Sequence, residues 1–526
     1  MESSKELFEK GISYYKGEGV EQSYEEAIKY FKLSAGLGNS IAQWALGDCY
    51  YDGVGVEQSF KEAVKYYKLA ADQGVADAQY SLGFSYDFGK GVKQSFVEAV
   101  KYYKLAANQG NVKAQSSLGF LYEYGKGIEQ SFEKAFEYYK LSADQGDSRA
   151  QYSLGGLYDI GKGVEQNSVK AFEYYKFSAD QGNADAQCSL GFCYDQGEGA
   201  EQSAEAATKY YKLSADQGNA DAQYMLGFCY YKGEGIEQSF EKAFEYYKLS
   251  ADQGNSTAQC DLGDCYYWGE GVEKNVEKAV KYYKLAAEQG DEDAQYVLGL
   301  CYSMGKGVEQ NLEEAAKYYK LSADQGNETA QYDLGLCYHE GEGVEQSFAK
   351  AVKYFKLSAD QGNDEGQVSL GMCYNDGEGV EQSFEKAAEY YKLSAEQGNE
   401  KAQNNLGYCY SKGNGVEKNI DEAIKYYKLA VDQGDANAQG NLGACYYRGE
   451  GVEKNIAKAV KYFKLSVAQG DQGDEDAQFL LGECYYKGEG VEQSFKEAVK
   501  YYKLAADQGN ADAKLKLKLD CLAKFM

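Results

Sequence analysis

Cysteine and histidine are the residue types in this sequence that could supply a nucleophile, a base or a metal ligand. There are thirteen cysteines and a single histidine, His339. A Cys–His catalytic pair needs the two side chains within hydrogen-bond reach. Cys337, the cysteine nearest to His339 in sequence, falls on the opposite side of a helix from it. No spacing of cysteine and histidine fits a zinc site. The sequence therefore predicts no catalytic residue, no cofactor and no metal.

Most of the cysteines share one position, two residues after a glycine that recurs along the chain. They are Cys49, Cys193, Cys229, Cys265, Cys301, Cys337, Cys373, Cys409, Cys445 and Cys484. Ser85 and Leu121 occupy the same position elsewhere, so it is a packing position. Packed helices lie about 8–10 Å apart, whereas a disulfide needs Cα atoms within about 7 Å. We expect these thiols to be buried and unpaired.

Three other motifs could indicate chemistry, and each has a structural explanation. Fourteen Gly-x-Gly loops resemble phosphate-binding loops, but they lack the third glycine and the preceding strand of a dinucleotide site. The acidic segment 471–476 lacks the spacing of an EF-hand calcium loop. Asn255 and Asn327 begin glycosylation sequons, yet both occupy positions expected to cap helices.

The recurring glycine shows how these residues are positioned. It occurs at 11, 47, 83, 119, 155, 191, 227, 263, 299, 335, 371, 407 and 443, always 36 residues apart. The next is Gly482, three residues late, because the chain inserts three residues near 471–473. A fixed period of this length indicates a solenoid of stacked supersecondary units.

One repeat, Asn219 to Gly254, predicts two helices. Its first helix, helix A, places Ala222, Leu226, Cys229 and Tyr230 on one stripe. Gly233 and Gly235 end it, since glycine tolerates the left-handed backbone of a helix C-cap. Helix B follows a Ser or Asn cap, here Ser239, and its apolar residues are Ala243, Tyr246, Tyr247 and Leu249. Six repeats also place a Glu three residues after this cap, which predicts capping boxes at Glu26, Glu62, Glu98, Glu314, Glu422 and Glu497.

Stacked hairpins of this kind predict an all-α chain with one continuous core. We expect residues 1–510 to form about fourteen repeats in a single continuous solenoid. Residues 511–526 form one more helix A, and Lys514, Lys516 and Lys518 make it polar, as a terminal capping helix must be.

The repeat resembles the Sel1-like repeat, a relative of the tetratricopeptide repeat. The matching residues are Ala222, Leu226-Gly227, Tyr230, Gly233-x-Gly235, Ala243 and Tyr246-Tyr247. The resemblance implies a right-handed superhelical α-solenoid of helix-turn-helix repeats, with helix A lining the concave surface. It also implies scaffold or adaptor roles in signalling and protein quality control, and no single ligand.

One face of helix A varies between repeats and is the predicted binding surface. Relative to the repeat alanine, positions 2, 6 and 9 lie opposite the core stripe; we call these positions the groove face. The residues that we expect to contact a partner are Trp44, Tyr80, Phe84, Asp87, Phe120, Glu123, Phe192, Asp195, Tyr224, Phe228, Tyr231, Tyr332 and His339. Exposed aromatic rings beside carboxylates suit a protein or peptide that carries Lys or Arg among apolar residues.

Composition narrows the class of partner and the location. The formal net charge is −28, which argues against nucleic acids and anionic membranes. The N-terminus has no apolar run of a signal peptide, and no segment is long and apolar enough to cross a membrane, so we expect a cytoplasmic scaffold. A secreted or luminal quality-control adaptor and a hydrolase of the kind proposed for some Sel1-like proteins are the alternatives.

Overall fold

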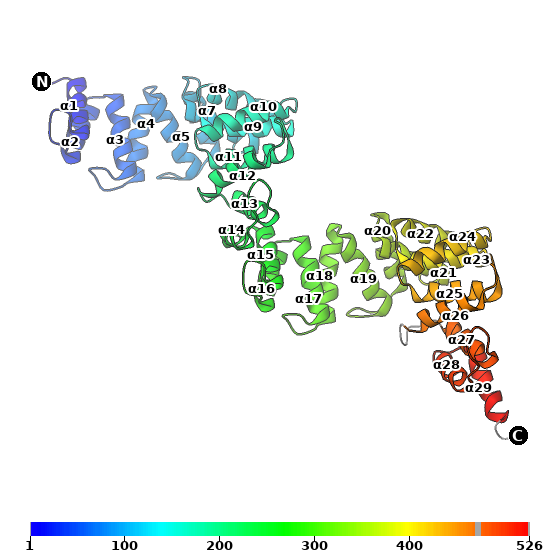
Figure 1. Cartoon of the computed structure of the whole chain (residues 1–526). Helices are drawn as coiled ribbons and strands as arrows, with labels where there is room; N and C mark the ends of the chain where they lie inside the picture. Colours follow the sequence, from blue (N-terminus) through cyan, green and yellow to red (C-terminus); the bar gives the residue numbers. More distant parts are fainter. Residues whose placement is uncertain (1, 469–474, 524–526) are drawn as a thin grey trace. The chain divides into compact units, whose positions relative to one another are not determined.

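Residues 2–468 and 475–523 are described by the structure, a computed structural model. Within these residues the chain forms 29 helices and no strand, which confirms the predicted all-α class (Figure 1). The helices divide into two compact units, one of Met1–Cys265 with Gly269–Glu273 and the other of Tyr266–Trp268 with Lys274–Met526. None of the helices in the described residues combines the length and the apolar composition that a bilayer crossing requires.

The first fifteen helices are α1 (Ser4–Lys16), α2 (Tyr24–Gly36), α3 (Ser40–Asp52), α4 (Phe60–Asp72), α5 (Ala76–Phe88), α6 (Phe96–Ala107), α7 (Val112–Tyr124), α8 (Phe132–Ala143), α9 (Ser148–Ile160), α10 (Ser168–Asp180), α11 (Ala184–Gln196), α12 (Ala204–Ala215), α13 (Ala220–Lys232), α14 (Phe240–Asp252) and α15 (Ser256–Trp268). The others are α16 (Val276–Glu288), α17 (Glu292–Met304), α18 (Leu312–Gln325), α19 (Glu328–Glu340), α20 (Phe348–Asp360), α21 (Asp364–Asp376), α22 (Phe384–Gln397), α23 (Glu400–Lys412), α24 (Ile420–Asp432), α25 (Ala436–Arg448), α26 (Ile456–Val467), α27 (Glu475–Lys487), α28 (Phe495–Asp507) and α29 (Ala511–Ala523). Odd-numbered helices are the predicted A helices and even-numbered helices are the B helices.

Helix ends follow the predicted capping residues. Helix α13 ends at Gly233, whose left-handed backbone has φ of 76°, and the odd-numbered helices from α1 to α25 all end at such a glycine. The Ser239 hydroxyl accepts from the Lys242 backbone N–H at the start of α14. Val75 begins α5 without a side-chain cap, as expected from its lack of a polar atom.

Each of the six predicted capping boxes forms only one of its two expected hydrogen bonds. The cap side chain accepts from the Glu backbone N–H in each, as Ser59 does from Glu62. The Glu carboxylate, however, contacts a Lys three residues further on, in the pairs Glu26–Lys29, Glu62–Lys65, Glu98–Lys101, Glu314–Lys317, Glu422–Lys425 and Glu497–Lys500. The reason is that the N–H which the carboxylate would accept from is already used, because Ser59 N donates to the Tyr50 carbonyl of helix A at 2.8 Å.

The core follows one stripe on each helix. In the hairpin of α13 and α14 the buried residues include Ala222, Leu226, Gly227 and Cys229 with Ala243, Tyr247, Ser250 and Ala251. Leu249 lies outside this core and is 49% exposed, because two residues from Tyr247 correspond to about 200° around a helix. Leu249, one of the apolar residues of helix B, therefore adds little to the buried core of its repeat.

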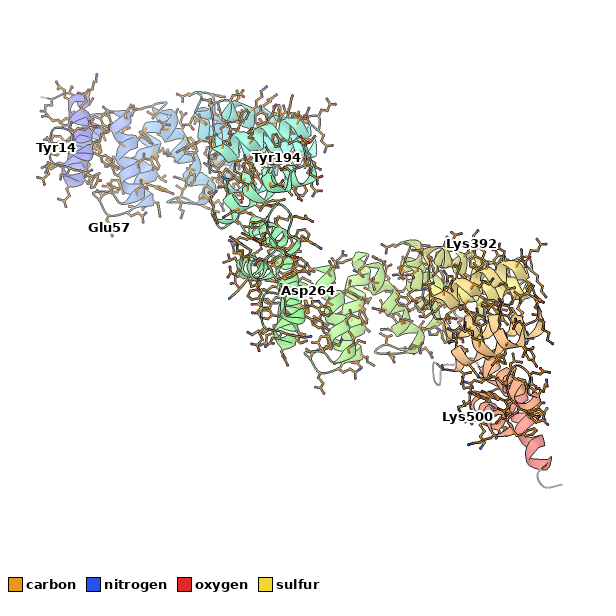
Figure 2. All side chains as sticks on the ribbon, viewed as in Figure 1. Tyr14, Glu57, Tyr194, Asp264, Lys392 and Lys500 are labelled. Atoms are coloured by element: carbon orange, nitrogen blue, oxygen red, sulfur yellow. The ribbon has the colours of Figure 1, made fainter. Side chains whose placement is uncertain are left out.

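Stacked tyrosines join helices A and B along one edge of each hairpin. Tyr14 stacks on Tyr30 with ring centroids 5.6 Å apart, and Tyr194 stacks on Tyr210 at 5.7 Å (Figure 2 labels Tyr14 and Tyr194). These pairs explain a large part of the unusual tyrosine content.

Buried glutamines join each hairpin to the next. Gln79, on helix α5, donates from Nε2 to the Ala71 carbonyl of α4 at 3.2 Å. Its Oε1 accepts from Gln109 Nε2, in the loop after α6, at 2.8 Å. The same Gln–Gln bond, between residues 30 apart, recurs at Gln43–Gln73, Gln115–Gln145, Gln151–Gln181, Gln187–Gln217, Gln223–Gln253, Gln295–Gln325, Gln331–Gln361, Gln367–Gln397 and Gln403–Gln433. The bond to the preceding alanine carbonyl joins two hairpins and the Gln–Gln bond lies within one repeat; we call the helix A glutamine with both bonds the glutamine latch.

Glycines allow the closest packing in the fold. A Cβ added to Gly227, the repeat glycine, would lie 2.7 Å from the Tyr247 ring of its partner helix. In the Gly-x-Gly loops after the first, the second glycine lies against the preceding hairpin. A Cβ on Gly343, for example, would overlap the carbonyl oxygen of Leu312 at the start of α18. The loops that resemble phosphate sites are thus packing contacts between repeats.

The Glu483 carboxylate makes an ion pair with the C-terminal helix. Glu483 of α27 contacts Lys516 of α29 at 2.8 Å and Lys487 at 2.9 Å, and it accepts from the Tyr502 hydroxyl at 2.7 Å. These contacts agree with a capping role for residues 511–526, which stays a prediction, as does the single continuous solenoid. The insertion near 471–473 lies outside the described residues.

Candidate functional site

The predicted partner-binding residues all lie on odd-numbered helices, and the structure distributes them over α3, α5, α7, α11, α13 and α19. They do not form one cluster. The structure groups Trp44 with Tyr80 and Phe84 around a cavity, while Phe228 and Tyr231 line a second, smaller one. Phe120 and Phe192 are the most exposed aromatic rings of the set, at 41% and 47%.

The aromatic residues at the first groove-face position are half-buried, because each packs on its own helix B. Tyr80 lies 5.7 Å from Tyr103, measured between ring centroids, and Tyr224 lies 5.8 Å from Tyr247. Tyr332 contacts Phe355 in the same way at 6.0 Å. Each of these rings therefore offers a partner only the part that its own repeat leaves uncovered.

The groove-face carboxylates have a structural role that the sequence analysis did not identify. Asp87 accepts a hydrogen bond from the buried Tyr103 hydroxyl at 3.1 Å, and Glu123 accepts one from Tyr139 at 2.7 Å. Asp48 does the same for Tyr67 at 2.8 Å. A buried hydroxyl without an acceptor costs about 1–3 kcal/mol, so these carboxylates stabilise the hairpin. Asp195 instead accepts from Gln196.

A pattern in the sequence could have revealed this role. Where helix B carries Phe31, Phe355 or Phe463 in place of the buried tyrosine, positions 6 and 9 of the same repeat hold no carboxylate. They hold Ile12 and Tyr15, Leu336 and His339, or Ala444 and Tyr447. A phenylalanine needs no acceptor, which fits the absence of an acid in these three repeats. The converse does not hold, because the repeats of Tyr247, Tyr319, Tyr391 and Tyr427 also lack one, and Tyr427 donates instead to Ser411 at 3.4 Å.

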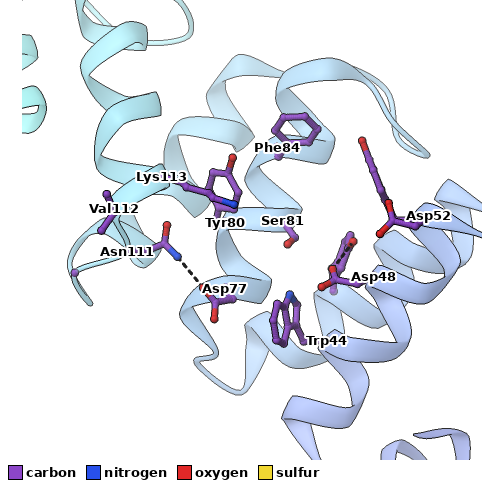
Figure 3. A pocket seen from close by; sticks show the side chains of 13 residues that line it. Trp44, Asp48, Asp52, Asp77, Tyr80, Ser81, Phe84, Asn111, Val112 and Lys113 are labelled. Carbon is purple, nitrogen blue, oxygen red and sulfur yellow. Dashed lines mark hydrogen bonds between the residues drawn. The ribbon is translucent and has the colours of Figure 1, made fainter. Parts of the chain in front are cut away.

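The larger cavity lies between α3, α5 and the start of α7 and measures about 650 Å³. Figure 3 shows Trp44 and Asp48 entering it from α3 and Tyr80 and Phe84 from α5, with Lys113 of α7 reaching toward Tyr80. The other lining residues are Tyr51, Asp52, Tyr67, Asp77, Ser81, Gly110, Asn111 and Val112. We call it the α3–α5 pocket.

Burial sets the protonation of the central acid in this pocket. Desolvation raises the pKa of Asp48 to about 6, although the hydrogen bond from Tyr67 favours the ionised form. Asp48 thus titrates near neutral pH, and a cation in the pocket would favour its charged form.

His339 is held between two glutamates. Its Nδ1 lies 3.0 Å from Glu340, and its Nε2 lies 2.9 Å from Glu378, in the loop after α21. Partial burial lowers the pKa of His339, but these two hydrogen bonds outweigh it and the net shift is upward. The histidine connects neighbouring repeats, and its edge contacts Phe348 at 5.3 Å.

The thiols are buried as expected. No disulfide joins the twelve cysteines whose side chains the structure describes, and ten of these cysteines are buried. Burial raises the pKa of Cys49, Cys193 and Cys265 to about 12. No group of three or more metal-ligating side chains occurs in the part of the chain that the structure describes.

Because a thiol reacts as its thiolate, these cysteines should resist alkylation in the folded protein. At pH 8 we expect the thiols of Cys49, Cys193 and Cys265 to react at least about a hundredfold more slowly than a free cysteine of pKa about 8.5. In denaturant without reductant, all thirteen should be alkylated. Intact-mass measurement before and after denaturation checks both, and fewer than thirteen adducts in denaturant would reveal disulfides.

The comparisons with known proteins agree with the hairpin geometry. The profile of the Sel1 repeat matches fourteen segments, at residues 11–39, 40–75, 76–111, 112–147, 148–183, 184–219, 220–255, 256–291, 292–327, 329–363, 364–399, 400–435, 436–471 and 475–510. The chain belongs to the Sel1 repeat family. Sel1 repeats generally mediate protein–protein interactions, and the family consists mainly of non-catalytic scaffolds.

Solved Sel1 repeat structures resemble this chain over much of its length. The protein c5321, a protective antigen present in uropathogenic Escherichia coli strains and displaying an SLR fold, is 31% identical with a TM-score of 0.67, over 89% of this chain and 98% of its own. A Sel1 repeat protein from Oxalobacter formigenes is 30% identical with a TM-score of 0.46, over 59% of this chain and 89% of its own. No curated protein matches.

Proposed function

We propose that this Sel1 repeat protein is a non-catalytic scaffold that binds a protein or peptide segment on its groove face. The observation that carries the proposal is the pair Phe120 and Phe192, which stay 41% and 47% exposed although other groove-face rings pack against their own helix B. Phe120 adjoins Tyr124, itself 57% exposed, with ring centroids 4.6 Å apart, and contiguous apolar surface of this kind on a monomer often marks a site that a partner covers.

Charge supports a partner with basic residues. The net charge of −28 attracts cations over the whole surface, and Asp195 lies three residues from Phe192 on the same helix. Asp87 and Glu123, which accept from buried tyrosines, add two further acidic groups to the groove face while they stabilise the fold. Apolar anchors with Lys or Arg between them fit such a surface.

The absence of disulfides among the described cysteine side chains supports a reducing compartment. Cysteines stay reduced where glutathione and thioredoxin act, as in the cytoplasm. The alternative, a secreted or luminal adaptor, requires an oxidising environment. There the same buried thiols would be oxidised only when the hairpins open.

Two phenylalanines of similar exposure provide a matched test of the groove face. Phe192 lies on helix A of its repeat and Phe177, 54% exposed, lies on helix B of the preceding one. We expect Phe192→Ala to weaken binding of a peptide selected from a displayed random library by about 5- to 150-fold, the range of a 1–3 kcal/mol hot spot. Phe177→Ala should change the affinity by less than about twofold.

Isothermal titration calorimetry measures both affinities, and circular dichroism checks that both variants keep their helicity. Equal losses for the two variants, or a loss for Phe177→Ala alone, would place the partner on helix B and contradict the proposal. Raising the salt concentration should also weaken binding, because salt screens the ionic contribution to the binding free energy. The contribution of the aromatic ring should persist.

A further inference from the structure

We propose that the α3–α5 pocket binds an arginine side chain of the partner peptide, with the guanidinium between aromatic faces and carboxylates. The inference rests on the proposed function and specifies one of its contacts. The pocket volume of about 650 Å³ falls within the range of about 300–1,000 Å³ typical of ligand sites. It can therefore hold a long side chain together with part of the backbone that carries it.

The aromatic lining already holds a cation of the chain itself. Lys113 Nζ lies 6.0 Å from the centroid of the Tyr80 ring, within the distance of a cation–π contact. Trp44 lines the same cavity from α3, and indole is the strongest aromatic partner for a cation. The Lys113 ammonium marks the position that a ligand cation would share or replace.

The charge of the pocket exceeds what this lysine neutralises. Three carboxylates line it, Asp48, Asp52 and Asp77, against one ammonium. Tyr67 donates to Asp48 and Asn111 donates to Asp77 at 2.9 Å, which hold both carboxylates in place. Fixed carboxylates beside aromatic faces are complementary to a cationic, partly apolar side chain.

Arginine fits this combination better than lysine. The guanidinium is planar, so that it stacks on an aromatic face while its N–H groups donate to carboxylates in the same plane. It is also more weakly hydrated than an ammonium, which lowers the cost of entering a half-buried site. A lysine ammonium can also make a cation–π contact, as Lys113 does, but it has no planar face to stack and no fork of N–H groups for a carboxylate.

The pocket offers a direct optical probe because the chain has two tryptophans. Trp268 is 65% exposed and lies outside the pocket, so Trp268→Phe leaves Trp44 as the sole tryptophan, and excitation at the long-wavelength edge of the indole band selects it over the tyrosines. We would titrate this variant with three capped pentapeptides that carry arginine, lysine or the neutral isostere citrulline between leucines. Saturable quenching by the arginine peptide is expected, with affinity about tenfold above the citrulline peptide and severalfold above the lysine peptide.

Substitutions at the two charges in the pocket should have opposite effects. Asp48→Asn keeps an acceptor for the Tyr67 hydroxyl and should weaken the arginine peptide about tenfold. Lys113→Ala should strengthen it about threefold or more, because the resident cation is removed. Lys68→Ala on α4, which removes the same charge from an exposed position outside the pocket, is the matched control and should change little.

Affinity for the arginine peptide should also rise between pH 5 and pH 7, since Asp48 ionises with a pKa of about 6. The groups that face Asp48 are Tyr67, Asp52, Asp77 and Lys113, with Tyr15 and Cys49 on its other side. Asp48→Asn should flatten this rise.

Equal binding of the arginine and citrulline peptides would overturn the inference, as would a Lys113→Ala variant that binds arginine more weakly. If Trp44 fluorescence does not respond but the library-selected peptide still depends on Phe192, the pocket assignment fails and the groove-face scaffold stands. If no peptide depends on Phe192 either, the proposed function fails as well.

Discussion

Replacing Gly343 with alanine is expected to open the junction between the hairpin of α17 and α18 and the hairpin of α19 and α20. Gly343 has φ of 70°, and a Cβ there would overlap the Leu312 carbonyl oxygen at the start of α18. The left-handed backbone costs a non-glycine residue about 1–2 kcal/mol, and overpacking costs about 1–3 kcal/mol more. Together these should lower the local stability by about 2–5 kcal/mol.

Gly362 provides the control, because it has φ of 98° and no atom lies within 4 Å of an added Cβ. Gly362→Ala should show only the backbone cost, about 1–2 kcal/mol. Hydrogen exchange of the amides in α18, α19 and α20 measures the local stability, which suits an array that need not unfold in one step. Equal losses of local stability in the two variants would mean that a Cβ at position 343 does not overlap α18.

Replacing Glu483 with glutamine is expected to release the C-terminal helix. The variant keeps the shape of the side chain but removes the charge that contacts Lys516 of α29 and Lys487 of α27. Burial alone would raise the pKa of Glu483, but the hydrogen bonds from Lys516, Tyr502 and Lys487 outweigh it and lower the pKa to about 2. The difference from an ordinary Glu of pKa about 4.3 corresponds to about 3 kcal/mol.

The pH dependence has a defined sign. A carboxylate whose pKa is lowered on folding adds stability above its unfolded pKa, and this stability is lost as the pH falls through the folded value. Protection of the α29 amides, corrected for intrinsic exchange, should be constant from pH 8 to about pH 5 and decrease from there toward pH 2. Glu483→Gln should lower it about a hundredfold at pH 7 and remove the dependence.

Glu492, an exposed residue of the loop after α27, is the control for this substitution. Glu492→Gln should leave α29 protection within about twofold of the wild type. Full protection of α29 in Glu483→Gln at pH 7 would show that Lys516 and Lys487 do not fix the terminal helix through this carboxylate.

The sequence predicted the hairpins well because their determinants are local. A glycine every 36 residues, Ser or Asn before helix B and Asn or Asp before helix A each act on neighbouring backbone atoms. The Glu capping boxes were wrong in their second half because the competing acceptor, Tyr50 O at Ser59, comes from another helix. The capping preferences of a single helix do not include that contact.

The groove face was harder to predict because its residues have two roles. Asp87 lies on the expected surface, yet its hydrogen bond to Tyr103 links it to the core. Tyr80 likewise covers Tyr103 with one face and lines the α3–α5 pocket with the rest. Periodicity identifies the side of a helix on which such a residue lies, but the partner of its polar atom is set by the packing of the next helix.

The glutamine latch makes the joints between hairpins interchangeable. Gln79 donates to the Ala71 carbonyl of the preceding hairpin at 3.2 Å, and Gln331 donates to the Ala323 carbonyl of its own preceding hairpin at the same distance. A hairpin lost or gained by unequal recombination between similar gene segments would therefore meet the same donor and acceptor at its new neighbour. The length of the array can change by whole units without a compensating substitution, while each new unit brings its own residues to the groove face.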